Sequence, residues 1–536
     1  MKKKYRKESL FFWIILFFAI LIRSVGFGNI PAGVNVDEAM AGVDAWALAQ
    51  YGTDRYGIRY PVHFLAWKYG QMSVLLSYCM IPFIKLLGFG IVSVRLPMLI
   101  VSCGTVILMY LVVKKLFDER LALVVMALTA LNPWHFMQSR WSLDCNLFPH
   151  VFLPAFYLLL LGLEKKRYLY LSMIFFGLTF YCYGIAVYSV IPFLVVFMLW
   201  CLWKKQLRWY DVFLCALICG FIALPEIMVM LINKYPWRFG WHGIETPLFT
   251  IGYFADSVRS NDILFLNFSF EQLGQNIWTL LQKCFFQTSD LPFNTISAFG
   301  PLYHVSIPFI GIGIVTFTKE LFTEKQTAKQ TRMLALWGYL VTGIWIGTVT
   351  FEVNVNRVNL IWLPLIIFCG YGIQKVVGWC KNHRINAKIV GGTIAGIYGL
   401  LGMLFLFTYF TSFRKDIQPY YNVDFLAAVE RADQMEEYDA LYITGTIDKQ
   451  FNTSAAEILT QFQCRIDAKY YQEETNITGG RELLPYGERY HFVYPEFVDE
   501  LQDGLYVFHT SDLPKLNCNY EIVETIGSYV FAVRQE

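Results

Sequence analysis

Residues 96–113 read LPMLIVSCGTVILMYLVV and contain no charged side chain, and Lys114 and Lys115 follow directly. An apolar stretch of this length next to basic residues is typical of a helix that crosses a bilayer and ends at its cytoplasmic side. The composition agrees, since 56% of the 536 residues are hydrophobic and only 16% are charged. Soluble domains carry about a quarter charged residues, so the sequence predicts a polytopic membrane protein.

Other segments along the chain are also apolar enough to form membrane-spanning helices. Together with 96–113, the predicted spans are residues 10–25, 96–113, 121–134, 151–163, 168–183, 187–203, 212–232, 305–317, 333–349, 360–377 and 389–410. The connections assigned to the cytoplasm are all basic, as the positive-inside rule requires. We therefore expect a polytopic α-helical protein of the cell membrane with about eleven spans, a cytoplasmic N-terminus and an extracytoplasmic C-terminus.

Residues 72–92 are apolar too, but a span there would reverse every later connection and break the charge bias. Pro82, Lys85 and Gly88 interrupt this segment. We expect it to form an interfacial or re-entrant helix on the outer side of the membrane.

Charge rises and long apolar runs end after residue 411. This change predicts a membrane domain, 1–411, with outer loops at 26–95 and 233–301, and a small extracytoplasmic α/β domain, 412–536. Alternating and helical patterns in this tail predict its elements. The expected strands are 440–444, 491–494, 505–508 and 529–533, and the expected helices are 423–436 and 454–462. Cys464 and Cys518 lie together in this polar region, where one disulfide would be compatible with the sequence.

Asp37 and Glu38 begin a helical stretch in the first outer loop, for which Asn35 or Asp37 could be the N-cap. Acids at such a position either cap the helix or act in catalysis. Four further candidates lie at the predicted outer ends of spans: His135, Arg140, Asp144 and Arg357. Lys68, in the first outer loop, is another.

Each of these residues also has a structural interpretation. Arg140 and Asp144 are four residues apart, which suits a local helical ion pair. Arg357 and Lys68 suit interfacial anchors. Taken together, an acid, a base and cations beside lipid are the groups that transfer from a lipid-phosphate donor requires. The net charge of +3 argues against nucleic acid as a partner.

Several local patterns resemble a known family. They are Val36-Asp37-Glu38, Trp67-Lys68, Val94-Arg95-Leu96-Pro97, Leu116-Phe117-Asp118-Glu119-Arg120, the stretch from Asn132-Pro133 to Asp144, and Asn356-Arg357 before Pro364. Their order and spacing resemble integral-membrane glycosyltransferases of the GT-C type, specifically the protein O-mannosyltransferase and lipid A aminoarabinose transferase group. The resemblance covers roughly residues 9–410.

The resemblance implies a polyprenyl-phosphate-linked sugar donor and no covalently bound cofactor. It implies Asp37 as the catalytic base, Asp144 as a second acidic position, Lys68 near the donor phosphate, and Arg357 as the basic residue before a late span. We expect Lys68 and Arg357 to stabilise the leaving phosphate. We expect Glu38, Arg140 and Asp144, with His135, to shape the acceptor side or to hold Asp37 in position. The acceptor would be a glycan, a lipid or a protein. Two departures are notable: Tyr69-Gly70 replaces the prolines common after the lysine, and no Asp-x-Asp pair lies near Asp144. A divalent metal, with Asp37 and Asp144 as its candidate ligands, is therefore left open.

Two other functional classes are compatible with such a chain. A transporter or lipid flippase predicts acids in the middle of spans and duplicated halves. Only Glu226 lies well inside a predicted span, and no repeat is evident. A non-catalytic membrane protein that binds a cell-surface polymer through its tail would not depend on Asp37.

Overall fold

The computed structural model describes residues 2–66, 71–254, 264, 268–350, 352–447, 450–472 and 486–535. Contacts between residues divide the chain into two units, which are described separately. The first, here called the helical unit, comprises Met1–Phe27, Met98–Gly240 and Ser257–Thr411. The second, the loop–tail unit, comprises Gly28–Pro97, Trp241–Asp256 and Ser412–Glu536.

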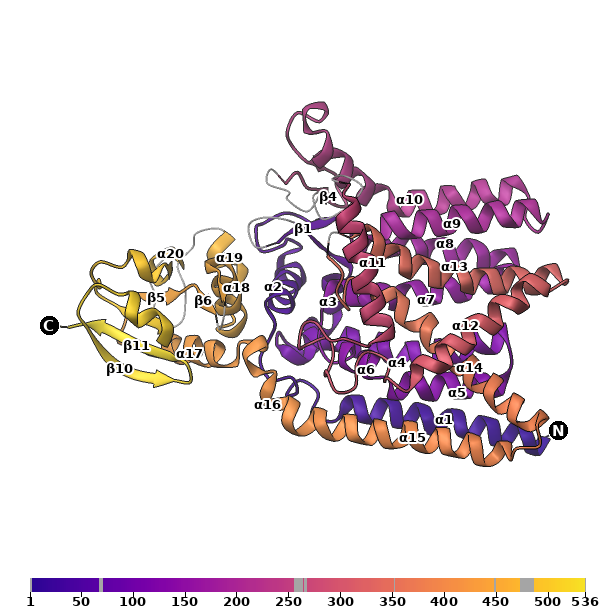
Figure 1. The fold of residues 1–536 in the computed structure, drawn as a ribbon. Coiled ribbons are helices and arrows are strands. Elements are labelled where there is room, and N and C mark those ends of the chain that lie inside the picture. Colours follow the sequence, from indigo (N-terminus) through magenta and orange to yellow (C-terminus); the bar gives the residue numbers. More distant parts are fainter. Residues whose placement is uncertain are drawn as a thin grey trace. The chain divides into compact units, whose positions relative to one another are not determined.

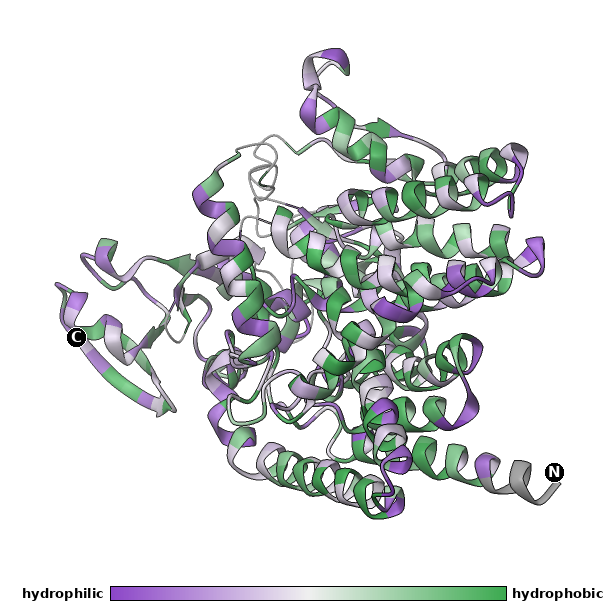
Figure 2. Ribbon diagram, turned by 45° about the vertical axis from the view of Figure 1, so that its right-hand side comes forward, coloured by the Kyte–Doolittle hydropathy of each residue, from purple (hydrophilic) through white to green (hydrophobic). Residues whose placement is uncertain are grey.

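The helical unit is built from long helices in which hydrophobic residues predominate (Figures 1 and 2). Its helices are α1 (Lys2–Ser24), α5 (Glu119–Leu131), α6 (Pro133–Gln138), α7 (Asp144–Gly162), α8 (Lys166–Leu178), α9 (Ala186–Trp203), α10 (Trp209–Lys234), α11 (Phe270–Phe285), α12 (Ser306–Thr323), α13 (Thr327–Val349), α14 (Trp362–Asn382) and α15 (Ala387–Thr408). Helix α4 (Ile91–Leu116) begins in the loop–tail unit and continues into this one.

In the described part of the chain, eight helices are long and apolar enough to cross a membrane. They coincide with eight of the predicted spans and confirm the polytopic helical fold. The other three predicted segments are also helical. However, α5 and α8 have only 13 residues each, and α1 carries basic residues near both ends. The number of spans beyond eight stays a prediction.

Helices α12 and α14 approach each other through two glycines. A Cβ atom on Gly313 would overlap the carbonyl oxygen of Phe368, and one on Gly372 would overlap that of Phe309. Small residues allow such contact between helix backbones inside a membrane, where the hydrophobic effect does not hold helices together.

The loop–tail unit contains most of the segment that the sequence predicts as the first outer loop. Its elements there are α2 (Val36–Tyr51), α3 (Leu75–Leu87) and the hairpin of β1 (His63–Leu65) and β2 (Gln71–Ser73). The predicted helix within 72–92 is α3, which has 13 residues and ends before Gly88, a residue with φ of 81°. A helix of this length is too short to span a bilayer. Its interfacial or re-entrant position stays a prediction.

The tail of this unit forms a mixed five-stranded sheet in the order β10-β11-β9-β5-β8. The strands are β5 (Leu441–Thr444), β8 (Tyr490–Val493), β9 (Leu505–His509), β10 (Tyr520–Ile526) and β11 (Tyr529–Arg534). Strand β5 runs parallel to β8 and β9, and the other pairs are antiparallel. Helices α17 (Val423–Asp433) and α18 (Thr453–Gln463) pack on the sheet. Four strands and both helices were predicted, whereas β10 was not.

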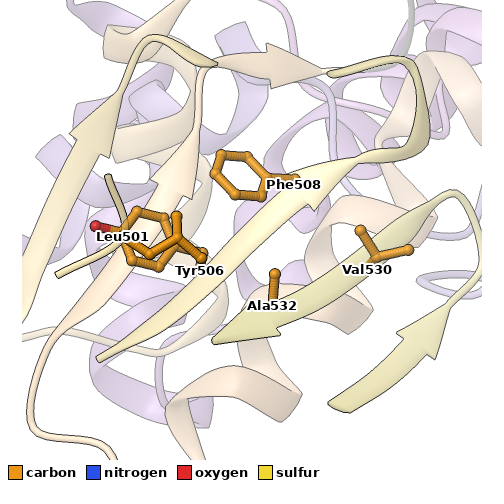
Figure 3. Close-up of a cluster of buried hydrophobic side chains, with 5 residues drawn as sticks. All are labelled: Leu501, Tyr506, Phe508, Val530 and Ala532. Carbon is orange, nitrogen blue, oxygen red and sulfur yellow. The ribbon is translucent and has the colours of Figure 1, made fainter. Parts of the chain in front are cut away.

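The two faces of this sheet bury different side chains, because successive residues of a strand point to opposite sides. Tyr529 of β11 contacts Phe425 of α17 and so faces the helices. The opposite face carries a separate hydrophobic cluster, drawn in Figure 3. Its members are Leu501, Tyr506, Phe508, Val530 and Ala532.

No disulfide joins Cys464 and Cys518, so that expectation is wrong. Cys518 packs against the cluster of Figure 3, whereas the sulfur of Cys464, at the end of α18, lies 3.7 Å from the carbonyl oxygen of Val429 in α17. The two cysteines share a polar region of the sequence but not a place in the fold.

We expect Gly372→Ala to destabilise the protein, because the new Cβ would collide with backbone that cannot move independently. Overpacking of this kind costs typically about 1–3 kcal/mol. Gly378→Ala in the same helix is the matched control, since a Cβ there meets nothing within 4 Å. Thermal unfolding of the detergent-solubilised protein measures both. Equal melting temperatures for the two variants would contradict the close α12–α14 contact.

Candidate active site

Asp37 lies in the first turn of α2, and the start of this helix is fixed by its neighbour Asn35. The side-chain oxygen of Asn35 accepts a hydrogen bond from the Asp37 backbone N–H at 3.1 Å, which makes Asn35 the N-cap. The Asn35 side chain also contacts the carbonyl oxygen of Tyr420 at 3.4 Å. Asp37 is partly exposed. Its carboxylate is favoured there by the positive end of the helix dipole.

Glu38 is the next residue, and it is completely buried. Arg95 binds both of its carboxylate oxygens, through Nε and Nη2, each at 2.8 Å. The remaining N–H groups of Arg95 donate to the carbonyl oxygens of Pro31 at 2.7 Å and Gly33 at 2.8 Å. The pair therefore joins the first turn of α2 to the chain before it and to the start of α4.

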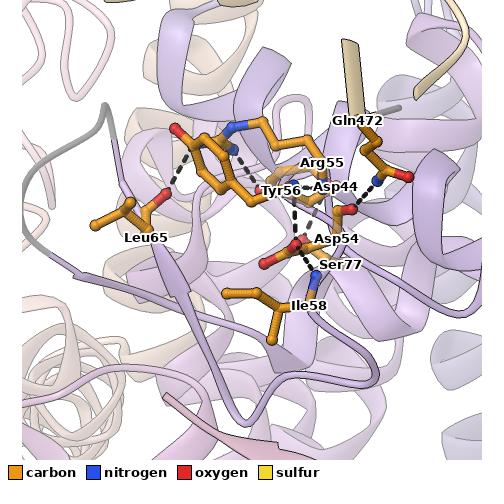
Figure 4. A network of polar contacts seen from close by, with 9 residues as sticks. Asp44, Asp54, Arg55, Tyr56, Ile58, Leu65, Ser77 and Gln472 are labelled. Atoms are coloured by element: carbon orange, nitrogen blue, oxygen red, sulfur yellow. Dashed lines mark hydrogen bonds and ion pairs between the residues drawn. The ribbon is translucent and has the colours of Figure 1, made fainter. Parts of the chain in front are cut away.

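A second buried network lies further along α2 (Figure 4). Asp44 accepts hydrogen bonds from the Arg55 backbone at 3.1 Å and from its guanidinium at 2.5 Å. Arg55 also donates to the carbonyl oxygen of Leu65 at 2.7 Å. Asp54 is buried close to Asp44, and desolvation together with that like charge raises the pKa of Asp54 to about 7. This network fixes the connection that follows α2.

Asp44, Asp54 and Arg55 are not among the site residues predicted from the sequence. A signal was available, because Asp44 interrupts the apolar pattern of its helix and an Asp-Arg pair follows the helix end at Gly52. Polar residues on an otherwise buried helix face normally have partners. Lys68, in contrast, was singled out but lies outside the described residues.

The other predicted site residues belong to the helical unit. Arg140 is fully buried and donates to the carbonyl oxygens of Arg23 at 2.7 Å and Val25 at 2.8 Å. These carbonyls lie at the C-terminal end of α1, where the helix dipole favours a cation. Arg140 and Asp144 do not share a helix, because α6 ends at Gln138 and α7 begins at Asp144.

His135 is buried in α6, where Asn132 caps the helix by accepting from the His135 backbone N–H at 2.9 Å. Its Nδ1 lies 2.9 Å from Nη2 of Arg23. A guanidinium can only donate, so Nδ1 accepts and the ring proton is on Nε2. The ring centroid of His150 lies 5.6 Å from the ring centroid of His135. Arg23, the one charged residue of the predicted span 10–25, is thus the partner of His135.

The segments that carry Asp144 and Arg357 are linked by amide side chains. Gln138 donates to the side-chain oxygen of Asn356 at 3.1 Å, and Asn359 donates to the carbonyl oxygen of Cys145. Asp144 is 7% exposed. Arg357 is partly exposed and forms an ion pair of 3.5 Å with the exposed Glu352.

The predicted site residues are thus divided between the two units. Asp37 and Glu38 belong to the loop–tail unit, and His135, Arg140, Asp144 and Arg357 belong to the helical unit. Within the described part of the chain, no three His, Cys, Asp or Glu side chains gather as a metal site.

Residues 72–228 match the family described as dolichyl-phosphate-mannose-protein mannosyltransferase. A search of curated proteins finds no significant match. Among solved structures, apo ArnT from Cupriavidus metallidurans aligns with a TM-score of 0.55 and 12% identity over 97% of both chains. The same enzyme bound to undecaprenyl phosphate aligns with a TM-score of 0.53 and 11% identity, again over 97% of both chains.

The apo oligosaccharyltransferase from Archaeoglobus fulgidus is a further structural neighbour. It aligns with a TM-score of 0.51 and 11% identity, over 85% of this chain and 64% of its own. At such identities the likeness concerns the fold. The protein therefore has the fold of ArnT and of the archaeal oligosaccharyltransferase, in agreement with the resemblance to GT-C glycosyltransferases that the sequence indicates.

Proposed function

We propose that the protein is a membrane glycosyltransferase that moves a sugar from a polyprenyl-phosphate donor to an acceptor hydroxyl on the outer face of the membrane. The observation that carries the proposal is the environment of Asp37. Asp37 is partly exposed in the first turn of α2, while the adjacent Glu38 is buried against Arg95. The protein thus holds Asp37 partly exposed at a fixed place on α2 and buries the adjacent acid in an ion pair.

In the proposed reaction, Asp37 accepts the proton of the acceptor hydroxyl. The hydroxyl oxygen forms a bond to the anomeric carbon of the donor sugar as the bond from that carbon to the phosphate oxygen breaks. The bond electrons leave with the polyprenyl phosphate, and the configuration at the anomeric carbon is inverted. A positioned general base contributes typically about 10²–10⁴-fold to such a step.

The phosphate gains negative charge as it leaves, and cationic side chains would stabilise it. We assign this role to Lys68 and Arg357, as the sequence pattern suggests. Arg357 is partly exposed and pairs with an exposed carboxylate, Glu352, at 3.5 Å. A phosphate could therefore replace Glu352 without leaving a buried charge unpaired.

The remaining residues would position the reacting groups. Glu38 and Arg95 hold the start of α2, Arg140 holds the end of α1, and His135 is held by Arg23. We assign Asp144 to the acceptor side, at the N-terminus of α7.

The orientation of the chain can be tested with fusions at its C-terminus. With the tail outside the cell, an alkaline phosphatase fusion should be active and a green fluorescent protein fusion should not fluoresce. The opposite pair of results would place the tail in the cytoplasm and contradict transfer on the outer face.

Asp37→Asn keeps the shape and most hydrogen bonds of the side chain but removes the base. We expect transfer to fall by at least about 10²-fold, with donor binding largely retained. The assay combines the purified full-length protein with a panel of polyprenyl-phosphate sugars and measures released polyprenyl phosphate and glycosylated acceptor.

Asp439→Asn is the control, because it makes the same chemical change at an exposed position of the tail. Wild-type turnover in the Asp37 variant would exclude Asp37 as the base. A wild-type protein that transfers none of the sugars would contradict the proposed function itself.

Glu38→Gln should act mainly on stability, because it leaves the buried Arg95 without its counter-charge. Breaking a buried ion pair costs about 3–5 kcal/mol. Glu524→Gln removes a more exposed partner, that of Arg431, and should cost far less. Thermal unfolding should give a lower melting temperature for Glu38→Gln than for Glu524→Gln.

The double variant Glu38→Gln/Arg95→Gln should recover part of the lost stability, since it leaves no unpaired charge. If Glu38→Gln instead kept wild-type stability but lost transfer, Glu38 would be the catalytic base and the assignment of Glu38 as a positioning residue would be wrong.

A further inference from the structure

A cavity of about 130 Å³ lies in the loop–tail unit, beside the connection that follows α2. Arg55 and Tyr56 line it from that connection, and Glu457 and Gln461 line it from α18. Tyr471, in α19 (Ala468–Gln472), and Tyr486, at the start of α20 (Tyr486–Arg489), also line it. The reaction proposed above involves none of these residues.

Two polar atoms at this cavity have no hydrogen-bond partner among the described residues. They are the hydroxyl of Tyr471 and the side-chain oxygen of Gln461. Gln461 is only 3% exposed, and its amide nitrogen donates to the hydroxyl of Tyr486 at 3.1 Å. Exchanging the oxygen and nitrogen of the Gln461 amide would still leave one of these two atoms without a hydrogen-bond partner among the described residues. Buried polar groups that lack partners in the protein are normally satisfied by water or a ligand.

The chemistry of the lining favours a neutral, hydroxylated ligand. The Arg55 guanidinium is already paired with Asp44 at 2.5 Å and so does not call for an anionic ligand, and Glu457 adds a carboxylate that can accept hydrogen bonds from hydroxyl groups. The tyrosine hydroxyls and the Gln461 amide both donate and accept hydrogen bonds, as sugar hydroxyls do. Apolar ring surface combined with a few fixed polar groups is the usual composition of a small-molecule site.

The position of the cavity connects it with Asp37. Arg55 is bound to Asp44, and Asp44 follows Asp37 by seven residues on α2. Seven residues are close to two helical turns, so both acids project from the same side of α2, about 10 Å apart along its axis. This is a separation that a short saccharide can bridge.

We propose that this cavity is a carbohydrate subsite that holds one pyranose unit of the acceptor, at a distance from the reacting hydroxyl. Tyr471 and Gln461 bind its hydroxyl groups, with Tyr486 and Arg55 beside them. This inference rests on the proposed function, because it takes the acceptor to be a glycan. It narrows the proposed acceptor from a glycan, a lipid or a protein to a molecule that already carries at least one sugar unit.

Binding can be measured without any donor. The probes are the methyl glycosides of glucose, galactose, mannose and N-acetylglucosamine, titrated against the purified full-length protein by saturation-transfer NMR. A pyranose of about a dozen heavy atoms at ordinary ligand efficiency should bind with a Kd on the order of 1 mM. We expect at least one glycoside to bind saturably in this range.

Tyr471→Phe removes only the hydroxyl. We expect about 5- to 10-fold weaker binding, the effect of one lost hydrogen bond. The melting temperature should be unchanged or higher, because the hydroxyl has no partner to lose within the described protein. A purely structural tyrosine would instead lower the melting temperature. Gln461→Leu should weaken binding similarly and serves as the second variant if the first fails to fold.

Tyr442→Phe is the matched control, since its hydroxyl donates to Gln502 at 2.8 Å and does not line the cavity. It should bind the glycosides as the wild type does. Absence of saturable binding by all four glycosides up to about 20 mM, well above the expected Kd, would overturn the subsite. So would wild-type binding by both cavity variants.

Different experimental results would overturn the proposed subsite and the proposed catalysis. Asp37→Asn should keep glycoside binding while losing transfer. Transfer without glycoside binding would overturn only the subsite. Glycoside binding by a protein that transfers none of the donor sugars would overturn the proposed function and, with it, the acceptor role of the cavity.

Discussion

The buried ion pair between Glu38 and Arg95 is the interaction on which the candidate site depends. Two charges removed from water are stable only if nearly every donor and acceptor is used. Arg95 meets this condition by donating to both oxygens of Glu38 and to the carbonyls of Pro31 and Gly33. The chain before α2 is therefore bound to the same guanidinium as the first turn of α2. The place of Asp37 follows from this arrangement, because Asp37 is adjacent to Glu38.

The helical unit uses arginine differently. Arg23 donates to the carbonyl oxygens of Ala19 and Ala130, and Arg140 donates to those of Arg23 and Val25. The carbonyls of Arg23, Val25 and Ala130 lie in the last turn of α1 or α5 or directly follow α1, where helices leave acceptors unsatisfied and where their dipoles are negative, and that of Ala19 lies one turn earlier in α1. A cation at such a place satisfies backbone groups that would otherwise be costly among apolar side chains. The same residue type thus closes helix ends in one unit and neutralises an acid in the other.

Much of the fold could be predicted because it follows from local patterns. The apolar segments gave the helices, Asn35 before Asp37 gave the N-cap of α2, and alternation in the tail gave β5, β8, β9 and β11. Strand β10 was missed because its sequence, YEIVETI, is mostly exposed and rich in acids. The grouping of the first outer loop with the tail could not be predicted, since it depends on contacts between residues hundreds of positions apart, such as Asn422 with the carbonyl oxygen of Val34.

The candidate site could be predicted less well than the fold, because it too depends on contacts between residues that are distant in the sequence. Asp37 and Glu38 are adjacent acids with the same local pattern, and helical geometry says only that they point about 100° apart. Which of them is buried depends on Arg95, whose position comes from the start of a later helix. Asp44 and Arg55 show the same limit, because their pairing requires the chain to turn back after Gly52. Sequence patterns can therefore indicate which polar residues are candidates for a functional site. Tertiary contacts decide which of these residues can react and which one holds the reacting residue in place.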